Sequence, residues 1–173
     1  NKLNKSQSYI SSIKLEDLKK AKKNGFIATG DYSNVKKLDV IIICVPTPLT
    51  KNKIPDLRFV NSTLSSLTPF IKKQQLISLE STTYPGTTDE IILPLLNKKK
   101  LIVGKDVYLS FSPERIDPAI RNISIKDIPK ITSGVTQNCL KVSSMIYAKI
   151  HKRIIKVSNT KAAETTKLLE NVF

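Results

Sequence analysis

Histidine and cysteine are scarce in this sequence. The chain has one histidine, His151, and two cysteines, Cys44 and Cys139. His151 lies near an expected loop, and we interpret it as a surface residue, which argues against a Ser-His-Asp triad. One histidine cannot form a multi-histidine metal site, and neither cysteine has a second ligand at metal-binding spacing. The sequence therefore predicts no metal centre.

Long apolar runs are also missing. No run approaches the roughly 18 residues that a membrane-spanning helix needs. The first twelve residues, NKLNKSQSYISS, lack the apolar core of a signal peptide. Cys44 lies inside the apolar run DVIIICVP and Cys139 begins a helical pattern, so both are interpreted as buried free thiols. These features predict a cytoplasmic protein with no membrane partner.

Acidic residues are outnumbered by basic ones. There are 14 Asp and Glu against 29 Lys and Arg, and the formal net charge is +15. Such a charge is typical of nucleic-acid binders. Only four of the basic residues are Arg, the residue that reads bases and phosphates bidentately, and no stacking aromatic residues lie among the lysines. We therefore favour compositional drift toward Lys on an ordinary surface, with no nucleic-acid partner and some attraction for anionic substrates.

Strand-like and helix-like segments alternate along the 173 residues, a length typical of one domain. This alternation predicts an α/β fold, a parallel sheet with flanking helices. The continuous apolar run at 37–45 predicts a strand that is buried on both faces. Pro94 predicts a kink or a short helix. The expected strands are 26–29, 37–45, 76–81, 106–112, 130–135 and 154–158, and the expected helices are 13–24, 57–72, 89–99, 137–151 and 159–173.

Hydroxyl groups follow the expected strand 76–81. The segment ESTTYPGTTDE at 80–90 places Ser81, Thr82 and Thr83 at the carboxyl end of that strand. They can hold a ligand, a water molecule or a helix N-terminus. A second polar segment, SFSPERIDP at 110–118, follows another strand. Because ligands bind beyond the carboxyl ends of parallel strands, the two segments predict a site at this edge.

Four motifs then carry a family resemblance. ICVPTPL at 43–49, ESTTYPGTT at 80–88, SPERIDP at 112–118 and AAETTKLLENVF at 162–173 resemble the UDP-glucose/GDP-mannose dehydrogenase family. They are most similar to its UDP-N-acetylglucosamine 6-dehydrogenase branch. Where relatives usually continue SPERIDP with Gly-Asn, this chain has AIRN at 119–122.

The resemblance implies a Rossmann-like NAD-binding domain at 1–157 and the start of a central dimerisation helix at 158–173. The sequence contains no GxGxxG, so the first strand and phosphate loop of that domain are expected to lie outside it. The nucleophilic cysteine and the UDP-sugar domain are expected outside it too. The chain is then an incomplete piece of the enzyme, inactive by itself.

The family oxidises the C6 alcohol of a UDP-sugar to a carboxylate with NAD, and a cysteine traps the aldehyde covalently. The resemblance implies a UDP-N-acetylhexosamine substrate, a role in surface polysaccharide synthesis, and a homodimer formed through the central helix. Two other interpretations stay open. One is a non-enzymatic basic binding module on a Rossmann-like scaffold, and the other is the remnant of a gene that makes no working enzyme.

The resemblance also implies catalytic roles. Thr82 matches a threonine that holds a catalytic water, or it only caps the strand end. Glu114 matches a glutamate that transfers a proton with that water, or it is a solvated loop charge. Lys167 and Asn171, four residues apart on one helix face, match the pair that binds the oxyanion and the sugar; otherwise they form a solvated face.

The remaining candidates contact ligands. Arg115 either pairs with Glu114 or holds a substrate anion. Glu164, one turn before Lys167, can form a surface ion pair with it instead. The resemblance places the cofactor against two segments that end buried strands, with the candidate residues Val45, Pro46, Thr47, Ser81, Thr82 and Thr83.

Overall fold

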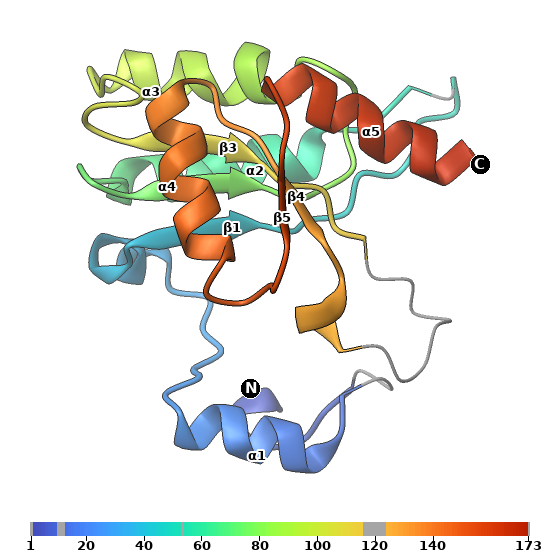
Figure 1. The fold of residues 1–173 in the computed structure, drawn as a ribbon. Coiled ribbons are helices and arrows are strands. Elements are labelled where there is room, and N and C mark those ends of the chain that lie inside the picture. The colour runs from blue at the N-terminus through green and yellow to red at the C-terminus, as the bar shows by residue number, and fades with distance from the viewer. Residues whose placement is uncertain (1, 10–12, 53, 116–123, 173) are drawn as a thin grey trace. The chain divides into compact units, whose positions relative to one another are not determined.

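The computed structural model describes residues 2–9, 13–52, 54–115 and 124–172, and of residues 171 and 172 it describes the backbone only (Figure 1). The chain divides into two compact units, Asn1–Ser33 and Asn34–Phe173. Among the described residues, no helix is both long enough and apolar enough to cross a bilayer.

The described part of the first unit contains a 3-10 turn, η1 (Leu3–Lys5), and one helix, α1 (Leu15–Lys23). The helix ends as predicted, with Gly25 at a φ of +95° just beyond its last turn. The strand expected at 26–29 was wrong, because these residues have no strand partner in the described chain. The side-chain amide of Asn4 bonds both backbone groups of Ala28 instead, at 2.7 and 2.8 Å.

The second unit is built on parallel strands, as predicted. Strands β1 (Val40–Ile43), β2 (Leu76–Leu79) and β3 (Tyr108–Phe111) pair in that order, and β4 (Lys130–Thr132) pairs with β5 (Ile154–Lys156). Beyond β4, the Ser133 N–H donates to Phe111 O at 3.0 Å and the Val135 N–H donates to Leu109 O at 3.1 Å. These two bonds connect the two sets of strands.

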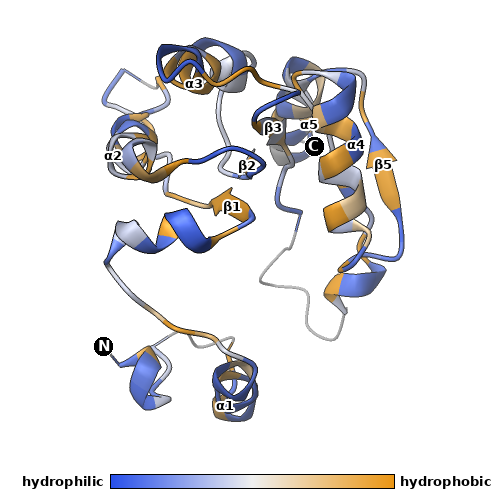
Figure 2. Cartoon of the chain, turned by 90° about the vertical axis from the view of Figure 1, so that its left-hand side faces the viewer, coloured by the Kyte–Doolittle hydropathy of each residue, from blue (hydrophilic) through white to orange (hydrophobic). Residues whose placement is uncertain are grey.

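Helices cover both faces of the three-stranded sheet (Figures 1 and 2). On one side lie α2 (Arg58–Leu67), which continues into η3 (Thr68–Phe70), and α3 (Leu93–Lys98). On the other side lies α4 (Gln137–Tyr147). A π-helical turn, η4 (Thr88–Ile92), precedes α3, so the helix around Pro94 is short, as predicted. The other elements are η2 (Tyr32–Lys37), η5 (Ile125–Asp127) and α5 (Thr160–Val172).

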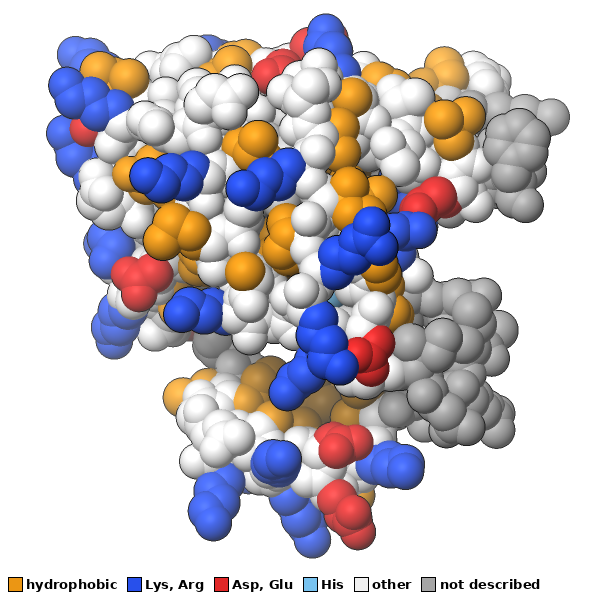
Figure 3. Space-filling model, viewed as in Figure 1, with side chains coloured by type: hydrophobic (Ala, Val, Ile, Leu, Met, Phe, Trp, Pro, Cys, Tyr) orange, Lys and Arg blue, Asp and Glu red, His pale blue; other side chains and the backbone are white. Residues whose placement is uncertain are grey.

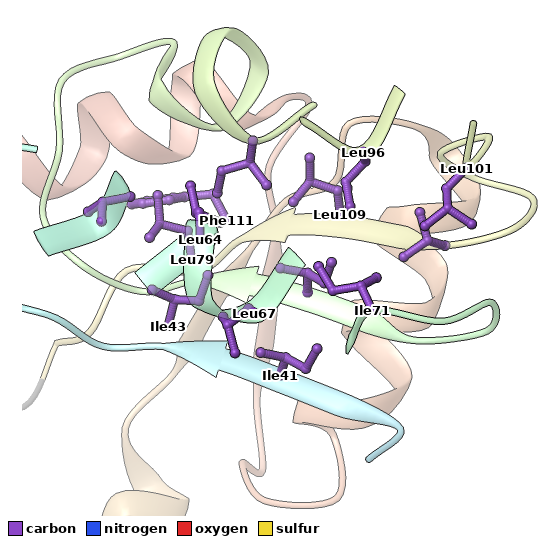
Figure 4. Close-up of a cluster of buried hydrophobic side chains, with 14 of the residues drawn as sticks. Ile41, Ile43, Leu64, Leu67, Ile71, Leu79, Leu96, Leu101, Leu109 and Phe111 are labelled. Carbon is purple, nitrogen blue, oxygen red and sulfur yellow. The ribbon is translucent and has the colours of Figure 1, made fainter. Parts of the chain in front are cut away.

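Apolar side chains of the sheet pack against α2 and α3 in one core (Figure 4). Leu79 and Phe111 are fully buried there, and α2 contributes Leu64. Each such side chain stabilises the fold by about 1.5–3 kcal/mol relative to an exposed one. The polar segments of the predicted site follow directly from these strands, so packing of the core fixes where each segment begins.

Strand β1 corrects two expectations. It is an edge of the three-stranded sheet, and its side chains alternate: Ile41 and Ile43 are buried, whereas Ile42 is 44% exposed. The run is therefore not buried on both faces. Cys44 continues the outward set and is exposed as a residue, so the expectation of a buried core residue was wrong. Cys139 is buried as predicted, and its sulfur accepts the Leu109 N–H at 3.3 Å.

Basic side chains are spread out over the face that carries α4. Figure 3 shows Lys and Arg side chains separated by uncharged ones on this face, and no single basic patch covers it. Among the lysines that the structure describes, Lys130 differs from the others because it is buried at the start of β4.

Candidate functional site

Residues 45–47 and 81–83 follow β1 and β2 at the carboxyl edge of the sheet, and hydrogen bonds hold them side by side. The Val45 N–H donates to Ser81 Oγ at 2.8 Å. The Thr47 hydroxyl donates to the Thr82 carbonyl oxygen at 2.5 Å. The Ser81 and Thr47 hydroxyls therefore join the two segments against which the family resemblance places the cofactor.

Thr83 is buried beside them, and its Oγ1 has no hydrogen-bond partner among the described residues. A buried hydroxyl left without a partner costs about 1–3 kcal/mol. The described residues therefore leave both the donor and the acceptor of this hydroxyl unused. Thr82, between Ser81 and Thr83, is half-buried.

Glu164 of α5 binds the turn that follows these hydroxyls. Its side chain is fully buried, and its carboxylate accepts the Gly86 N–H at 2.5 Å, the Thr88 N–H at 2.9 Å and the Thr88 hydroxyl at 2.7 Å. The alternative of a surface ion pair between Glu164 and Lys167 was therefore wrong. Burial raises the pKa of Glu164, and the bonds from Gly86 and Thr88 oppose that rise.

Two more contacts strengthen this attachment. The Thr160 hydroxyl, at the start of α5, donates to the Asp89 carboxylate, and Lys161 lies 3.6 Å from Glu90. Gly86 adopts a φ of +109°, which strongly favours glycine. The YPGTT turn and α5 are thus fixed to each other along the first turns of the helix.

Glu114 lies in a cluster that the sequence did not reveal. Its carboxylate is 3.4 Å from the Lys130 ammonium, which also lies 3.0 Å from Glu80 Oε2 and 3.3 Å from the Pro113 carbonyl oxygen. Glu80 and Lys130 are buried, whereas the Glu114 side chain is 46% exposed. The one available signal was a lysine at the start of the expected strand 130–135.

The buried side of this cluster is closed by α4. The Tyr147 hydroxyl lies 2.5 Å from Glu80 Oε1 and 2.8 Å from Ser78 Oγ. Burial, and then the Glu80 charge, raise the pKa of Tyr147. Burial of its sulfur, followed by Glu80, also raises the pKa of Cys44 to about 11, although the residue is exposed as a whole. Cys44 is thus a protonated thiol at neutral pH and a poor nucleophile.

The Arg115 side chain does not form the ion pair with Glu114 that was one of its two expected roles. Its Nε lies 2.6 Å from Glu170 of α5. Its backbone N–H donates to Glu114 Oε1 at 2.8 Å. The Arg115 side chain therefore attaches the segment after β3 to α5.

Lys167 is half-buried between these two attachments, and no carboxylate of the described residues pairs with it. Glu164, three residues before it, holds the YPGTT turn, and Glu170, three residues after it, holds Arg115. One stretch of α5 thus contacts the segments that follow β2 and β3. Figure 1 shows α5 beyond the arrowheads of these strands. The side chain of Asn171 and the loop 119–122 lie outside the described residues.

The fold and the site define a class of protein, the Rossmann-type dehydrogenases, whose ligands bind at this edge of a parallel sheet. The model of the UDP-glucose/GDP-mannose dehydrogenase family, NAD binding domain, matches residues 1–151. The chain therefore belongs to the UDP-glucose/GDP-mannose dehydrogenase family, and NAD is the cofactor of this domain.

Individual relatives agree with the family model. The chain is 36% identical over 158 residues to Protein CapL of Staphylococcus aureus, covering 88% of this chain and 36% of CapL. It is 34% identical over 157 residues to a UDP-N-acetyl-D-glucosamine 6-dehydrogenase of Pseudomonas aeruginosa, covering 90% and 37%. The structure of a UDP-D-ManNAc dehydrogenase from Pyrococcus horikoshii matches with a TM-score of 0.91 at 30% identity, covering 99% and 41%. The chain thus spans a little over a third of these curated relatives.

Proposed function

We propose that this chain supplies part of an NAD-dependent enzyme that oxidises the C6 alcohol of a UDP-N-acetylhexosamine to the uronic acid, for surface polysaccharide synthesis. Family membership supports the enzyme class, and the names of the relatives support the substrate class. The observation that carries the proposal is the double attachment of α5, at Glu164 and Glu170, around Lys167. The two free cysteines favour the cytoplasm.

The residues at the carboxyl edge fit one half of NAD. The partnerless Thr83 hydroxyl and the rigid 45–47 turn would face the nicotinamide and its ribose, with Val45, Pro46, Thr47, Ser81 and Thr82 as neighbours. The cofactor, when bound, accepts a hydride from C6. The 173 residues contain no GxGxxG, so this chain offers no glycine-rich loop for the diphosphate.

The chain's own catalytic groups would act on protons and charge. Thr82 would hold a water molecule, and Glu114, half exposed, would move a proton between that water and the C6 hydroxyl. Lys167, which has no described carboxylate partner, would stabilise the oxygen that becomes negative. Asn171, one turn further along α5, would bind the sugar beside it.

We also propose that α5 begins a surface through which two copies pair. Leu169 on this helix is an exposed apolar residue. An exposed leucine stabilises a dimer when a second copy removes it from water. Sedimentation of the complete protein should show a dimer that Leu169→Asp weakens, and an unchanged dimer would remove α5 from the interface.

The cofactor assignment is testable on the 173-residue chain itself. Nicotinamide mononucleotide should shift the backbone amide signals of residues 45–47 and 81–83, whereas AMP should leave them unchanged. Thr83→Val should reduce the shifts, and Thr165→Val, which changes an exposed threonine of α5, should not. Binding of NAD itself should be weak, because the chain has no phosphate loop.

A turnover assay tests whether the chain is active by itself. The purified chain should make no NADH from a panel of UDP-sugars. NADH formation by these 173 residues would show that the catalytic site is complete without further residues. Equal effects of the mononucleotide and AMP, or signals that move only in other segments, would contradict the assignment of this edge to nicotinamide.

A further inference from the structure

Lys130 is the one buried basic side chain among the described residues. Its side chain is 4% exposed, and its ammonium group has three oxygen acceptors within 3.4 Å: Glu80 Oε2, the Pro113 carbonyl oxygen and Glu114 Oε2. A lysine ammonium has three N–H donors, so this set uses all of them. The ammonium also lies 5.2 Å from the centre of the Tyr147 ring, which attracts a cation.

Glu80 is fixed from its other side. The Tyr147 hydroxyl contacts Glu80 Oε1, and the same hydroxyl contacts Ser78. The buried carboxylate therefore balances the buried ammonium, and both groups are held by β2, β4 and α4. Glu114 is the outer member of the cluster, half exposed at the carboxyl edge.

Fold stability alone is a weak reason for this arrangement. Desolvation of a buried ion pair costs several kcal/mol per ion, and apolar replacements of such pairs are often equally stable. This pair does something that an apolar pair would not do, because its ammonium contacts both the backbone of Pro113 and the side chain of Glu114.

We propose that Lys130 is a positioning residue for Glu114, held in place by Glu80 and Tyr147. Lys130 fixes the Glu114 carboxylate and the turn before it, and Glu80 keeps the ammonium from binding Glu114 too strongly for proton transfer. This role of Lys130 rests on the proposed function, in which Glu114 moves a proton. The geometry and its electrostatic consequences are measurable without cofactor or substrate.

Other charged and titratable groups near Glu114 also bear on its titration. Arg115 is adjacent, but its guanidinium is paired with Glu170. The Cys44 thiol is close enough to the cluster to sense the charges of Glu80, Lys130 and Glu114. Both the thiol and the Tyr147 hydroxyl have raised pKa values and stay neutral at the pH where carboxylates titrate.

The test is the titration of the Glu114 carboxyl carbon, followed by carbon-detected NMR and assigned through loss of its signal in Glu114→Gln. Lys130→Met removes the cation and should move the Glu114 midpoint to higher pH by about one unit, the lower end of the effect of a close opposite charge. Glu80→Gln removes the competing carboxylate and should move the midpoint to lower pH. Lys130→Arg should restore the wild-type midpoint.

Two further variants keep the test decisive. Removing one member of a buried pair can unfold a protein, whereas Glu80→Gln combined with Lys130→Met removes both charges. In the double variant the midpoint should lie between those of wild type and Lys130→Met. Lys156→Met, which changes an exposed lysine of β5, should have no effect.

The sign of the shift in Glu80→Gln alone decides the proposal if Lys130→Met does not fold. If the Glu114 midpoint moves in opposite directions in the two single variants, the result supports a Lys130 ammonium that is shared between Glu80 and Glu114. The proposal is overturned by a Glu114 midpoint that stays constant in every folded variant, or that moves in the same direction in both single variants. Failure here would leave the mononucleotide result unaffected, so the two proposals fail separately.

Discussion

At the residue scale, hydroxyl groups join the segments of the site. Ser81 accepts the Val45 N–H, Thr47 donates to the Thr82 carbonyl, and Thr88 donates to Glu164. The hydroxyls that the sequence placed together at a strand end therefore divide into two kinds. Ser81 is used by the fold, whereas Thr83 keeps its hydrogen-bonding capacity.

The Cys44 thiol should lose its proton only at high pH. Because burial, then Glu80, raise its pKa from 9.0 to about 11, the rate of alkylation at Cys44 should keep rising up to about pH 11. At pH 7.5 it should be about 100-fold slower than in the urea-unfolded chain, since two pH units change the thiolate fraction by that factor. Mass spectrometry of the alkylated peptide measures both rates. A rate that levels off near pH 9 would contradict this environment.

The same shift has a consequence for stability. The folded-state pKa lies above the unfolded value, so folding favours the protonated thiol. Its contribution is complete below about pH 9 and is lost between pH 9 and 11. Cys44→Ser should remove this part of the alkaline loss of stability.

Gly134 is required by a close approach of backbone. A Cβ placed there would lie 2.2 Å from Leu140 N and 2.7 Å from Cys139 C, both main-chain atoms of α4. Gly134→Ala should therefore destabilise the second unit by about 3 kcal/mol, the upper range for overpacking. Loss of the amide signals of β2 and β3 in urea reports this unit.

The matched control is Gly30→Ala, because a Cβ at Gly30 would meet no heavy atom within 4 Å. This variant should leave the urea midpoint of the second unit unchanged. Equal midpoints for Gly134→Ala and wild type would show that α4 can move away from the turn after β4.

At the element scale, α5 depends on one buried carboxylate more than on its surface ion pairs. Glu164→Ala leaves three donors of Gly86 and Thr88 without an acceptor in a buried place. The free energy that holds α5 to the turn should fall by about 3 kcal/mol. Amide hydrogen exchange of α5 should then be about 100-fold faster, since 1.4 kcal/mol corresponds to a factor of ten.

Glu170→Ala provides the comparison on the same helix. It removes the partly exposed pair with Arg115, and exposed pairs contribute about 0–1 kcal/mol. Its effect on exchange should be small. If both variants accelerate exchange equally, Glu164 does not have the special role that its burial indicates.

Element types and their parallel arrangement were predictable because they follow local patterns. Apolar periodicity predicted α2 and its neighbours, and Pro94 predicted that α3 is kinked or short. The strand at 26–29 failed because the Asn4 amide, distant in the sequence, bonds both backbone groups of Ala28. The partners of Glu164 and Lys130 were equally unpredictable, since both residues look like ordinary surface charges until the chain brings them to their acceptors and donors.

At the scale of the whole molecule, α5 joins the separate segments of the second unit. It binds the turn after β2 through Glu164 and the segment after β3 through Glu170, and it carries Lys167 between these contacts. The motifs suggested that these segments belong to one site, but sequence order alone does not place them in space. The side-chain contacts of α5 supply that placement.

The most direct test of this account is paramagnetic relaxation from a nitroxide placed at Lys167→Cys in a Cys44→Ser background. The label should broaden the amide signals of both Thr82 and Glu114. A label at Lys98→Cys, an exposed position at the end of α3, should broaden neither. If the label at position 167 leaves either signal sharp, the three residues do not share one site.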